Sequence, residues 1–340
     1  MFGVDVKVEA ERVHDSQDAL RVLDVSKRFP GGFTAVDNIS FGVGNETLAL
    51  LGPNGAGKTT TFNMIRGNIG PSEGDIKVCG KSIAYNQADA RLGLGVTPQF
   101  TAVDSQLTVK EHLMIYGSLK ACDIPLGIHG KVLKQNVDLL MEATALTKYA
   151  DRLATKLSGG NGRKLSLALS LIGNPRVLLI DEYSTGVDAA TKRAMWKTLR
   201  RVSHGKAVVI TTHSMEEAAA LSSRIGILAK RMLAIGTLET LTSRFSTYEV
   251  QFAARTPLDA AHASALMSRL PGVRQAKDLG TRYEVPIGKT PLAELFRTLS
   301  DQEVDDGESD NGIRLDYSVE RMGLESVFLK VIQERDDPYA

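Results

Sequence analysis

A glycine-rich segment between an apolar run and a helical pattern constrains the fold of this chain more than any other feature. Residues 52–59 read Gly-Pro-Asn-Gly-Ala-Gly-Lys-Thr and directly follow the apolar residues 47–51. This spacing is the complete P-loop pattern, in which glycines let the backbone approach phosphate oxygens and the next helix directs its N-terminal N–H groups at them. The sequence therefore predicts a strand–loop–helix unit that binds the phosphates of a nucleoside triphosphate.

The P-loop pattern gives its polar side chains defined roles. Lys58 can reach the β- and γ-phosphates, and the hydroxyl of Thr59 can coordinate Mg²⁺. The glycines allow the backbone to wrap closely around the phosphate oxygens. The predicted nucleotide-binding segment consists of Gly52, Asn54, Gly55, Ala56, Gly57, Lys58, Thr59 and Thr60.

A second segment supplies two adjacent carboxylates. Residues 177–180 are a continuous apolar run, the pattern of a buried parallel strand, and Asp181 and Glu182 follow it. At the carboxyl end of such a strand, beside the P-loop, Asp181 is a natural partner of Mg²⁺, directly or through water. Glu182 can orient and deprotonate an attacking water. The alternative is a pair of solvated surface acids.

The order of apolar runs and helical patterns predicts two folded parts. Over residues 20–244 we expect an α/β fold of the P-loop NTPase class, with a parallel sheet and with antiparallel β and α-helical subdomains. Residues 245–340 follow the order β-α-β-α-β-α, which predicts a small α+β domain of ferredoxin-like type. Residues 1–19 are mixed and charged, and we expect an N-terminal tail that is not a signal peptide.

Charge and hydropathy restrict the partners of the chain. The net charge is +1, so no nucleic-acid partner and no general attraction to an anionic membrane is expected. The sequence has no apolar run of about 18 residues, the length at which a membrane span becomes a candidate. If the protein acts at a membrane, another segment or chain supplies the membrane part.

A Ser-Gly-Gly sequence opens a further helical pattern. The hydroxyl of Ser158, followed by Gly159 and Gly160, can bind an anion at the start of a helix. Taken alone, an ordinary N-cap serine with a flexible glycine pair is the better reading. The chain would then have two phosphate-binding ends but one P-loop. Two copies, or two homologous domains, could use both ends if they were arranged head to tail.

With these motifs in this order, residues 20–240 resemble the nucleotide-binding domain of ATP-binding cassette (ABC) transporters. Phe29 stands where that family has an aromatic residue that stacks on adenine, and Gln99 matches the Q-loop glutamine near Mg²⁺ and the γ-phosphate. Residues 157–161 match the signature motif. The segment Thr185-Gly186-Val187-Asp188 matches the D-loop, and His213 matches the switch histidine that contacts the γ-phosphate.

The resemblance implies an ATPase with ATP and Mg²⁺ as cofactors. Its catalytic residues would be Lys58, Gln99, Glu182 and His213. Its metal-binding residues would be Thr59, Gln99 and Asp181. Besides the P-loop, the nucleotide would be contacted by Phe29 and by a second group of residues, Ser158, Gly159, Gly160 and Asp188.

Three segments resemble one branch of the family. Residues 158–166 and 213–218 are similar to the second nucleotide-binding domain of the eukaryotic A subfamily, and residues 324–331 are similar to the end of its regulatory domain. Two positions depart from the general family pattern. Asn161 stands where glutamine is more usual, and Tyr183 replaces the proline after the catalytic glutamate. Tyrosine lacks the fixed φ of proline, so the turn after the glutamate is less constrained.

The A-subfamily resemblance implies the motor domain of a lipid exporter or translocator. Such a domain would act at the cytosolic face of a membrane, with transmembrane domains and a second nucleotide-binding domain as partners. Three alternatives are an ATPase subunit of a bacterial drug or polysaccharide exporter, a regulatory ABC ATPase with weak hydrolysis, and a soluble ABC ATPase that acts on ribosomes or chromosomes. The last kind usually has two cassettes or a coiled-coil insertion, and neither is visible here.

Overall fold

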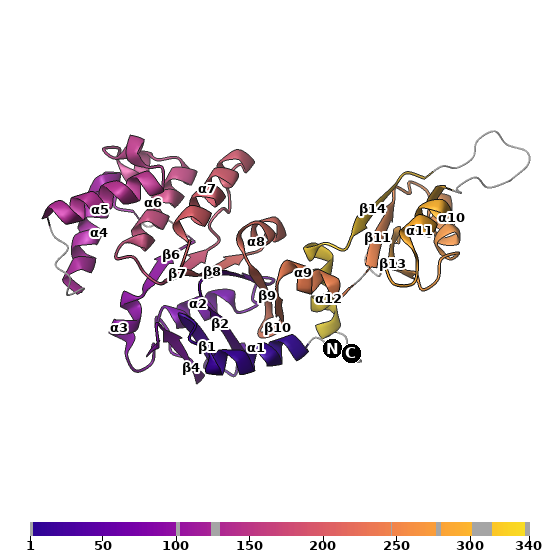
Figure 1. The fold of residues 1–340 in the computed structure, drawn as a ribbon, viewed down its shortest axis with the longest axis horizontal. Coiled ribbons are helices and arrows are strands. Elements are labelled where there is room, and N and C mark those ends of the chain that lie inside the picture. The colour runs from indigo at the N-terminus through magenta and orange to yellow at the C-terminus, as the bar shows by residue number, and fades with distance from the viewer. Residues whose placement is uncertain are drawn as a thin grey trace, which may run out of the picture. The chain divides into compact units, whose positions relative to one another are not determined.

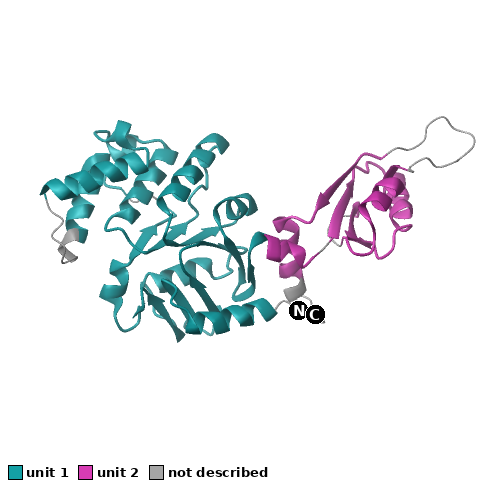
Figure 2. Ribbon diagram, viewed as in Figure 1, with its two compact units in different colours: residues 1–238, 334–340 teal, residues 239–333 magenta. Residues whose placement is uncertain are grey.

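The computed structural model of this chain describes residues 3–99, 103–123, 130–245, 247–276, 280–300 and 315–336. The chain divides into two compact units, which Figure 2 shows in different colours. Unit 1 comprises residues 1–238 and 334–340, and unit 2 comprises residues 239–333. The division therefore falls six residues before the expected start of the C-terminal domain at residue 245.

A six-stranded sheet forms the centre of unit 1, with the strand order β10-β9-β3-β8-β7-β6. Five strands are parallel, and β10 pairs antiparallel with β9. Its central strands consist mainly of apolar residues that are buried on both faces, as expected for a covered parallel sheet. The strands are β3 (Thr47–Leu51), β6 (Leu94–Thr97), β7 (Val177–Asp181), β8 (Ala207–Thr212), β9 (Arg224–Ala229) and β10 (Arg231–Gly236).

A smaller antiparallel sheet lies in the N-terminal part of unit 1, with the order β2-β1-β4-β5 (Figure 1). Its strands are β1 (Leu20–Arg28), β2 (Thr34–Val43), β4 (Glu73–Val78) and β5 (Lys81–Ser82). Apolar side chains from β1, β2 and β4 share one buried cluster with side chains of the central sheet and of helix α2 (Lys58–Ile65). The core of unit 1 therefore joins the two sheets directly.

The first segment differs from the expected N-terminal tail. Helix α1 (Gly3–Asp15) packs against β1, β2 and β10. The buried Glu9 carboxylate accepts hydrogen bonds from the Arg12 guanidinium and from the Gly42 backbone N–H, both at 2.9–3.0 Å, and forms a 2.6 Å ion pair with Arg224. Val13 is fully buried. The helix is therefore attached to unit 1 by a buried ion-pair network and an apolar contact.

A helical subdomain lies between β6 and β7 in the sequence, as expected. It contains α4 (Val109–Asp123), α5 (Gly130–Ala143) and α6 (Gly159–Leu171), whose apolar faces form a separate buried cluster. Thr108 and Glu111 cap α4 reciprocally through their side chains and backbone N–H groups. The remaining helices of unit 1 are α3 (Gln87–Leu92), α7 (Ala189–Val202) and α8 (Met215–Leu221), with short 3₁₀ turns at Thr147–Tyr149 and Ala154–Lys156.

Unit 2 is an antiparallel sheet with helices and its own core. The strand order is β12-β13-β11-β14, and every pairing is antiparallel. The elements are α9 (Leu238–Ser243), β11 (Thr247–Phe252), α10 (Pro257–Met267), β12 (Arg274–Gln275), β13 (Arg282–Pro286), α11 (Leu292–Ser300), β14 (Tyr317–Arg321) and α12 (Leu324–Asp336). This composition is α+β; the ferredoxin-like classification stays a prediction.

Two sequence expectations for unit 2 concern its last strand and the segment before it. The strand expected at residues 313–317 overlaps the observed strand, which pairs with β11 over Tyr317–Arg321, only at Tyr317; residues 313 and 314 lie outside the described residues. The acidic loop expected at residues 301–311 lies outside the described residues. Among the described residues, no helix is long and apolar enough to cross a membrane.

Candidate active site

Four adjacent strands bring the predicted catalytic segments to one edge of the central sheet (Figure 1). Strands β3, β8, β7 and β6 are parallel neighbours, so their carboxyl ends lie along the same edge. Each strand is followed within two residues by a predicted site residue, in spatial order Gly52, His213, Glu182 and Gln99. Segments that are far apart in the sequence thus meet because the sheet is parallel.

The P-loop connects β3 to α2 through backbone that only glycine accommodates. A Cβ atom on Gly52 would lie 2.3 Å from the carbonyl oxygen of Leu228. Gly57 has φ +97°, and a Cβ atom there would lie 2.6 Å from the carbonyl oxygen of Ala35. The loop therefore approaches neighbouring backbone closely and presents the N-terminus of α2 without intervening side chains, as a phosphate cradle requires.

Lys58 is the first residue of α2, and its side chain folds back over the loop. Its Nζ donates hydrogen bonds to the carbonyl oxygens of Gly52 at 2.6 Å and Pro53 at 3.1 Å. Burial lowers the pKa of Lys58, and the charges of Glu182 and Asp181 partly oppose that shift. A buried amine with only neutral hydrogen-bond acceptors would gain a strong partner from a phosphate oxygen.

Asp181 ends β7 and is half-buried, with its carboxylate accepting a hydrogen bond from the Thr211 hydroxyl of the neighbouring strand β8. The exposed Thr59 hydroxyl lies in the first turn of α2. In the described part of the chain, no group of three or more His, Cys, Asp or Glu residues could hold a metal ion. These few oxygen donors fit Mg²⁺, which commonly takes one or two protein ligands and completes its shell with substrate phosphates and water.

Glu182 is held in place from three sides. Gln99 donates a 2.7 Å hydrogen bond from Nε2 to Glu182 Oε2, and Nδ1 of His213 lies 3.7 Å from Glu182 Oε1. The backbone N–H of Glu182 bonds to the carbonyl oxygen of Thr211 at 3.1 Å. Glu182 has φ +45°, in the left-handed region that a non-glycine residue rarely adopts. Strain of this kind persists at functional sites where the surroundings fix the conformation.

The side chains of Glu182 and His213 differ in solvent exposure in a way that suits catalysis. The Glu182 side chain is 19% exposed, whereas that of His213 is 61% exposed. The structure thus places a mostly enclosed carboxylate beside an accessible imidazole, at the carboxyl edge of the sheet. A substrate could reach both groups from the solvent side.

Comparison with known proteins assigns this arrangement to a family. The pattern described as "ABC transporter" matches residues 36–185, which include the P-loop, Glu182 and the segment with Ser158. The cassette of this chain belongs to the ABC transporter family. The bovine retinal-specific phospholipid-transporting ATPase ABCA4 is 35% identical over 98% of this chain, and the human phospholipid-transporting ATPase ABCA7 is 36% identical over 96%. The chain spans only 15% of the length of each.

Solved structures support the ABC fold of the cassette. An ATP-binding subunit of an ABC transporter is 25% identical, with a TM-score of 0.58 over 67% of this chain and 93% of that subunit. A dimeric ATP-binding cassette, MJ0796, bound to ADP and Pi, is 22% identical, with a TM-score of 0.57 over 64% of this chain and 98% of its own. The predicted P-loop ABC fold is therefore confirmed.

Ser158 and Asp188, the residues predicted as part of the signature motif and the D-loop, cap helices of their own chain. The Ser158 hydroxyl accepts a 3.4 Å hydrogen bond from the Asn161 backbone N–H at the start of α6, and Asp188 accepts one of 3.0 Å from the Thr191 backbone N–H at the start of α7. Neither side chain makes a hydrogen bond or an ion pair with the P-loop among the described residues. The structure thus brings together the P-loop, Gln99, Asp181, Glu182 and His213, but not these two residues.

Two side chains next to Phe29, those of Phe33 and Lys230, were not predicted from the sequence. Phe29 stacks on Phe33 with ring centroids 6.4 Å apart, and Phe33 is the more exposed ring, at 54%. The Lys230 amine lies 5.2 Å from the centre of the Phe33 ring, and the Lys230 backbone N–H donates to the P-loop carbonyl of Ala56 at 2.8 Å. The sequence feature that could have identified Phe33 is that it is an aromatic residue four positions after Phe29.

Arg163 links the ABC signature helix to the Q-loop. It lies in α6 and donates a 3.2 Å hydrogen bond to the carbonyl oxygen of Pro98, next to Gln99. Burial lowers the pKa of Arg163, against the raising effect of the nearby charges of Glu182 and Asp181. Two short contacts, Arg163 with Pro98 and Gln99 with Glu182, therefore connect this helix to Glu182.

Tyr183 fills the position of the usual proline and is buried, with 2% exposure. Burial raises the pKa of Tyr183, so the phenol stays neutral. Its hydroxyl has no hydrogen-bond partner in the described structure. The aromatic ring thus anchors the turn after Glu182 by packing in place of the ring constraint of proline.

Proposed function

We propose that this chain is the ATP-hydrolysing motor domain of a membrane transporter that moves lipids. The observation that supports it most directly is the placement of Glu182, which Gln99 holds at 2.7 Å beside His213 and at the same sheet edge as the P-loop. A carboxylate so placed is suited to orient an attacking water and to accept its proton. A simple nucleotide-binding regulatory module would not need such a group.

Different residues of the cassette would have different roles in phosphoryl transfer. Lys58 and the backbone N–H groups of the P-loop would bind the phosphates and neutralise their charge. Thr59, Asp181 and Gln99 would hold Mg²⁺, which contributes charge neutralisation at the β- and γ-phosphates. Glu182 would take the proton of the water, and the exposed His213 would contact the γ-phosphate. Phe29 and Phe33 together offer an aromatic surface for the adenine base.

A second cassette would complete each site. Ser158 and the glycines after it open α6 with N–H groups that only a ligand or solvent can satisfy, and they do not contact the P-loop of their own chain. We infer that this helix start, together with Asp188, binds the nucleotide held by the P-loop of a partner cassette. ATP would then favour the closed pair, and hydrolysis would release it.

The proposals for the lipid substrate and for the cellular location are based on similarity to the relatives. Relatives over 96–98% of this chain are named as phospholipid-transporting ATPases. By this similarity, the chain would work at the cytosolic face of a membrane, and transmembrane domains would select a phospholipid. The same similarity favours a lipid transporter over a drug or polysaccharide exporter.

A complementation experiment tests the composite site. Lys58→Ala should weaken ATP binding, and Ser158→Phe should block the signature helix, so each variant alone should release little phosphate. In a mixed pair, one site would combine the intact P-loop of the Ser158→Phe chain with the intact signature of the Lys58→Ala chain. Phosphate release from the mixture should therefore clearly exceed the sum of the separate rates.

The contrary result would be a mixture whose rate of phosphate release does not exceed the sum of the separate rates. For this result to count, both variants must be folded, as shown by a wild-type far-ultraviolet circular dichroism spectrum. That result would contradict the shared site. A wild-type rate per chain that stays constant on dilution would contradict it independently, because a composite site requires association.

A further inference from the structure

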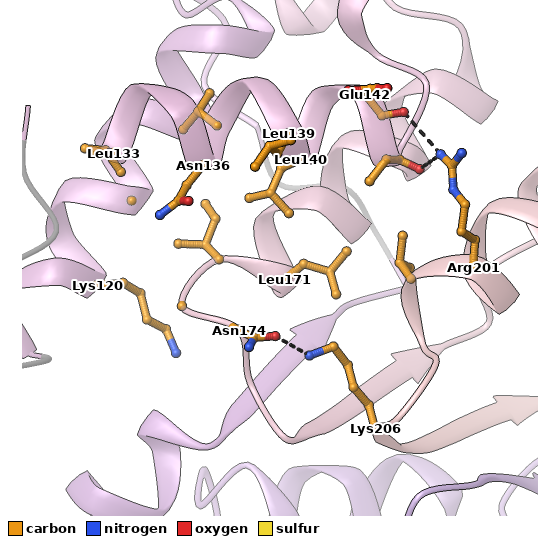
Figure 3. Close-up of a pocket in the computed structure, with 16 residues that line it drawn as sticks. Lys120, Leu133, Asn136, Leu139, Leu140, Glu142, Leu171, Asn174, Arg201 and Lys206 are labelled. Atoms are coloured by element: carbon orange, nitrogen blue, oxygen red, sulfur yellow. Dashed lines mark hydrogen bonds between the residues drawn. The ribbon is translucent and has the colours of Figure 1, made fainter. Parts of the chain in front are cut away.

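A cavity of about 910 Å³ opens in unit 1 among helices α4, α5, α6 and α7 (Figure 3). It lies at the edge of the central sheet where β7 and β8 begin, since Asn174 and Lys206 in its wall precede Val177 and Ala207. The catalytic residues follow the opposite ends of these strands. The cavity is therefore separate from the nucleotide site, and its volume falls within the range of about 300–1,000 Å³ typical of small-ligand pockets.

The wall of the cavity is mainly apolar. Three helices contribute aliphatic side chains, and Figure 3 shows Leu133, Leu140 and Leu171 around the same space. Leu139, on the same helix as Leu140, is 62% exposed at the opening. Such a surface favours the hydrocarbon part of a ligand.

One end of the cavity carries positive charge. Lys206 donates hydrogen bonds to Asn174 Oδ1 at 2.6 Å and to the carbonyl oxygen of Pro175 at 2.9 Å, and no carboxylate pairs with it in the described structure. Burial lowers the pKa of Lys206, and the charge of Arg176 adds to that effect. In Figure 3 the amines of Lys120 and Lys206 both point toward the loop that holds Asn174. A partly desolvated amine with neutral partners is favourably placed for an anion.

A third cation, Arg201, lies elsewhere in the wall of the cavity. The Arg201 guanidinium donates to the carbonyl oxygens of Glu142 and Ala143 at the end of α5, and it too has no carboxylate partner among the described residues. This arrangement satisfies the last carbonyl groups of the helix. Arg201 therefore has a structural role, which leaves Lys206 as the principal candidate for ligand binding.

We propose that this cavity binds a single-chain amphipathic carboxylate, with its hydrocarbon chain against Leu133, Leu140 and Leu171 and its head group at Lys206. The apolar wall and the charge at one end match the two parts of such a molecule. A neutral amphiphile would lack the partner for Lys206, and a small anion would leave the apolar wall unfilled.

Calorimetric titration of the full chain with decanoate at neutral pH, below its micelle concentration, tests the proposal. We expect one saturable site, with decanol binding at least about tenfold more weakly and acetate not binding, because each probe lacks one of the two matching parts. Equal binding of decanol and decanoate, or no saturable decanoate binding, would overturn the proposal.

Variants locate the site. Lys206→Met keeps the aliphatic stem but removes the charge, and it should weaken decanoate binding at least about tenfold. Leu140→Trp should fill the cavity and abolish binding. Lys197→Met removes an exposed lysine of α7 that does not line the cavity, and it should bind decanoate as the wild type does.

ATP affinity provides the folding control, because the nucleotide site lies at the opposite edge of the sheet. Each variant should keep the wild-type value. A Lys206→Met chain that retains both ATP and decanoate affinity would show that the carboxylate does not bind at this lysine.

Discussion

The two units use the same kinds of elements, but among the described residues only unit 1 gathers the predicted catalytic side chains at one sheet edge. In unit 1 the neighbouring strands β3, β8, β7 and β6 are parallel, so the residues after them converge at one edge. In unit 2 every pairing is antiparallel, and Thr247 at the start of β11 lies opposite Pro286 at the end of β13. Carboxyl ends of neighbouring strands therefore lie at opposite edges. Strand direction, more than residue composition, decides where a multi-strand site can form.

Both units combine local and long-range polar pairs. In unit 2, Thr256 and Asp259 form a capping box on α10, whereas Lys330 of α12 pairs with Glu284 of β13 at 2.7 Å. In unit 1, the hydrogen bond between Gln99 and Glu182 is long-range. Local pairs stabilise an element wherever it lies, whereas long-range pairs depend on the whole fold. Catalytic geometry in unit 1 is thus a property of the assembled sheet.

The largest expected effect is on catalysis in unit 1. Glu182→Gln should lower the rate of phosphate release by about 10²–10⁴-fold, because the amide cannot accept the proton of the water. ATP affinity should persist, since Lys58 and the P-loop are intact. A phosphate-release assay and a nucleotide titration measure both quantities. Glu216→Gln changes an exposed glutamate and serves as the control; wild-type turnover in Glu182→Gln would refute the assignment.

The next effect concerns stability in unit 2. Leu295 is fully buried in its core, so Leu295→Ala should lower the free energy of unfolding of this unit by about 2–5 kcal/mol. Leu292, on the same helix, is 43% exposed, and Leu292→Ala should cost much less. Chemical denaturation measures the difference. Equal costs for the two variants would contradict the described core.

A pH-dependent effect should appear in unit 1. Burial raises the pKa of Glu9, but hydrogen bonds from Arg12, Arg224 and the Gly42 N–H outweigh it and hold the pKa below its ordinary value. The stabilisation is then complete above the unfolded pKa of about 4.3 and is lost as the pH falls through the folded pKa.

Denaturation curves of Glu9→Gln against pH test this linkage. At pH 7 the variant should lose about 1–3 kcal/mol of unfolding free energy, because it removes charged hydrogen bonds. The difference from the wild type should shrink as the pH falls below about 4. A difference that stays constant through this range would exclude a depressed pKa of Glu9.

The smallest expected effect is on the unfolding free energy and concerns two tyrosines, one in each unit. Tyr183 and Tyr283 are buried, and both hydroxyls lack a hydrogen-bond partner in the described structure. Tyr183→Phe and Tyr283→Phe should each raise the unfolding free energy by about 1 kcal/mol, since each removes an unsatisfied polar group. Thermal and chemical denaturation measure the gain. A loss in either variant would show that its hydroxyl has a partner.

The sequence predicted the features that depend on local spacing. The P-loop and the Asp181-Glu182 pair follow strands whose apolar runs are continuous, so their places at the sheet edge could be inferred before the structure was known. Helix α1 could not be placed in this way. Its attachment depends on Glu9 meeting Arg224, and no local pattern reports a pairing between residues so distant in the sequence.

The contacts between the site residues could not be predicted from local sequence patterns either. Gln99 and Glu182 were each predicted as site residues, but their hydrogen bond depends on β6 and β7 being neighbours. Phe33 was missed because family resemblance directs attention to Phe29, and only the fold shows that the two rings stack. The assignments of the individual site residues stay predictions until they are tested by substitution.

The bond between Gln99 and Glu182 makes the acid responsive to small displacements of a distant chain segment. Its length is 2.7 Å, and such a bond is lost beyond about 3.5 Å, so a shift of the Gln99 segment by less than about 1 Å is enough to release the carboxylate. A freed carboxylate oxygen regains a lone pair for water. A force that displaces the segment with Gln99 would thereby start hydrolysis of the γ-phosphate bond of ATP.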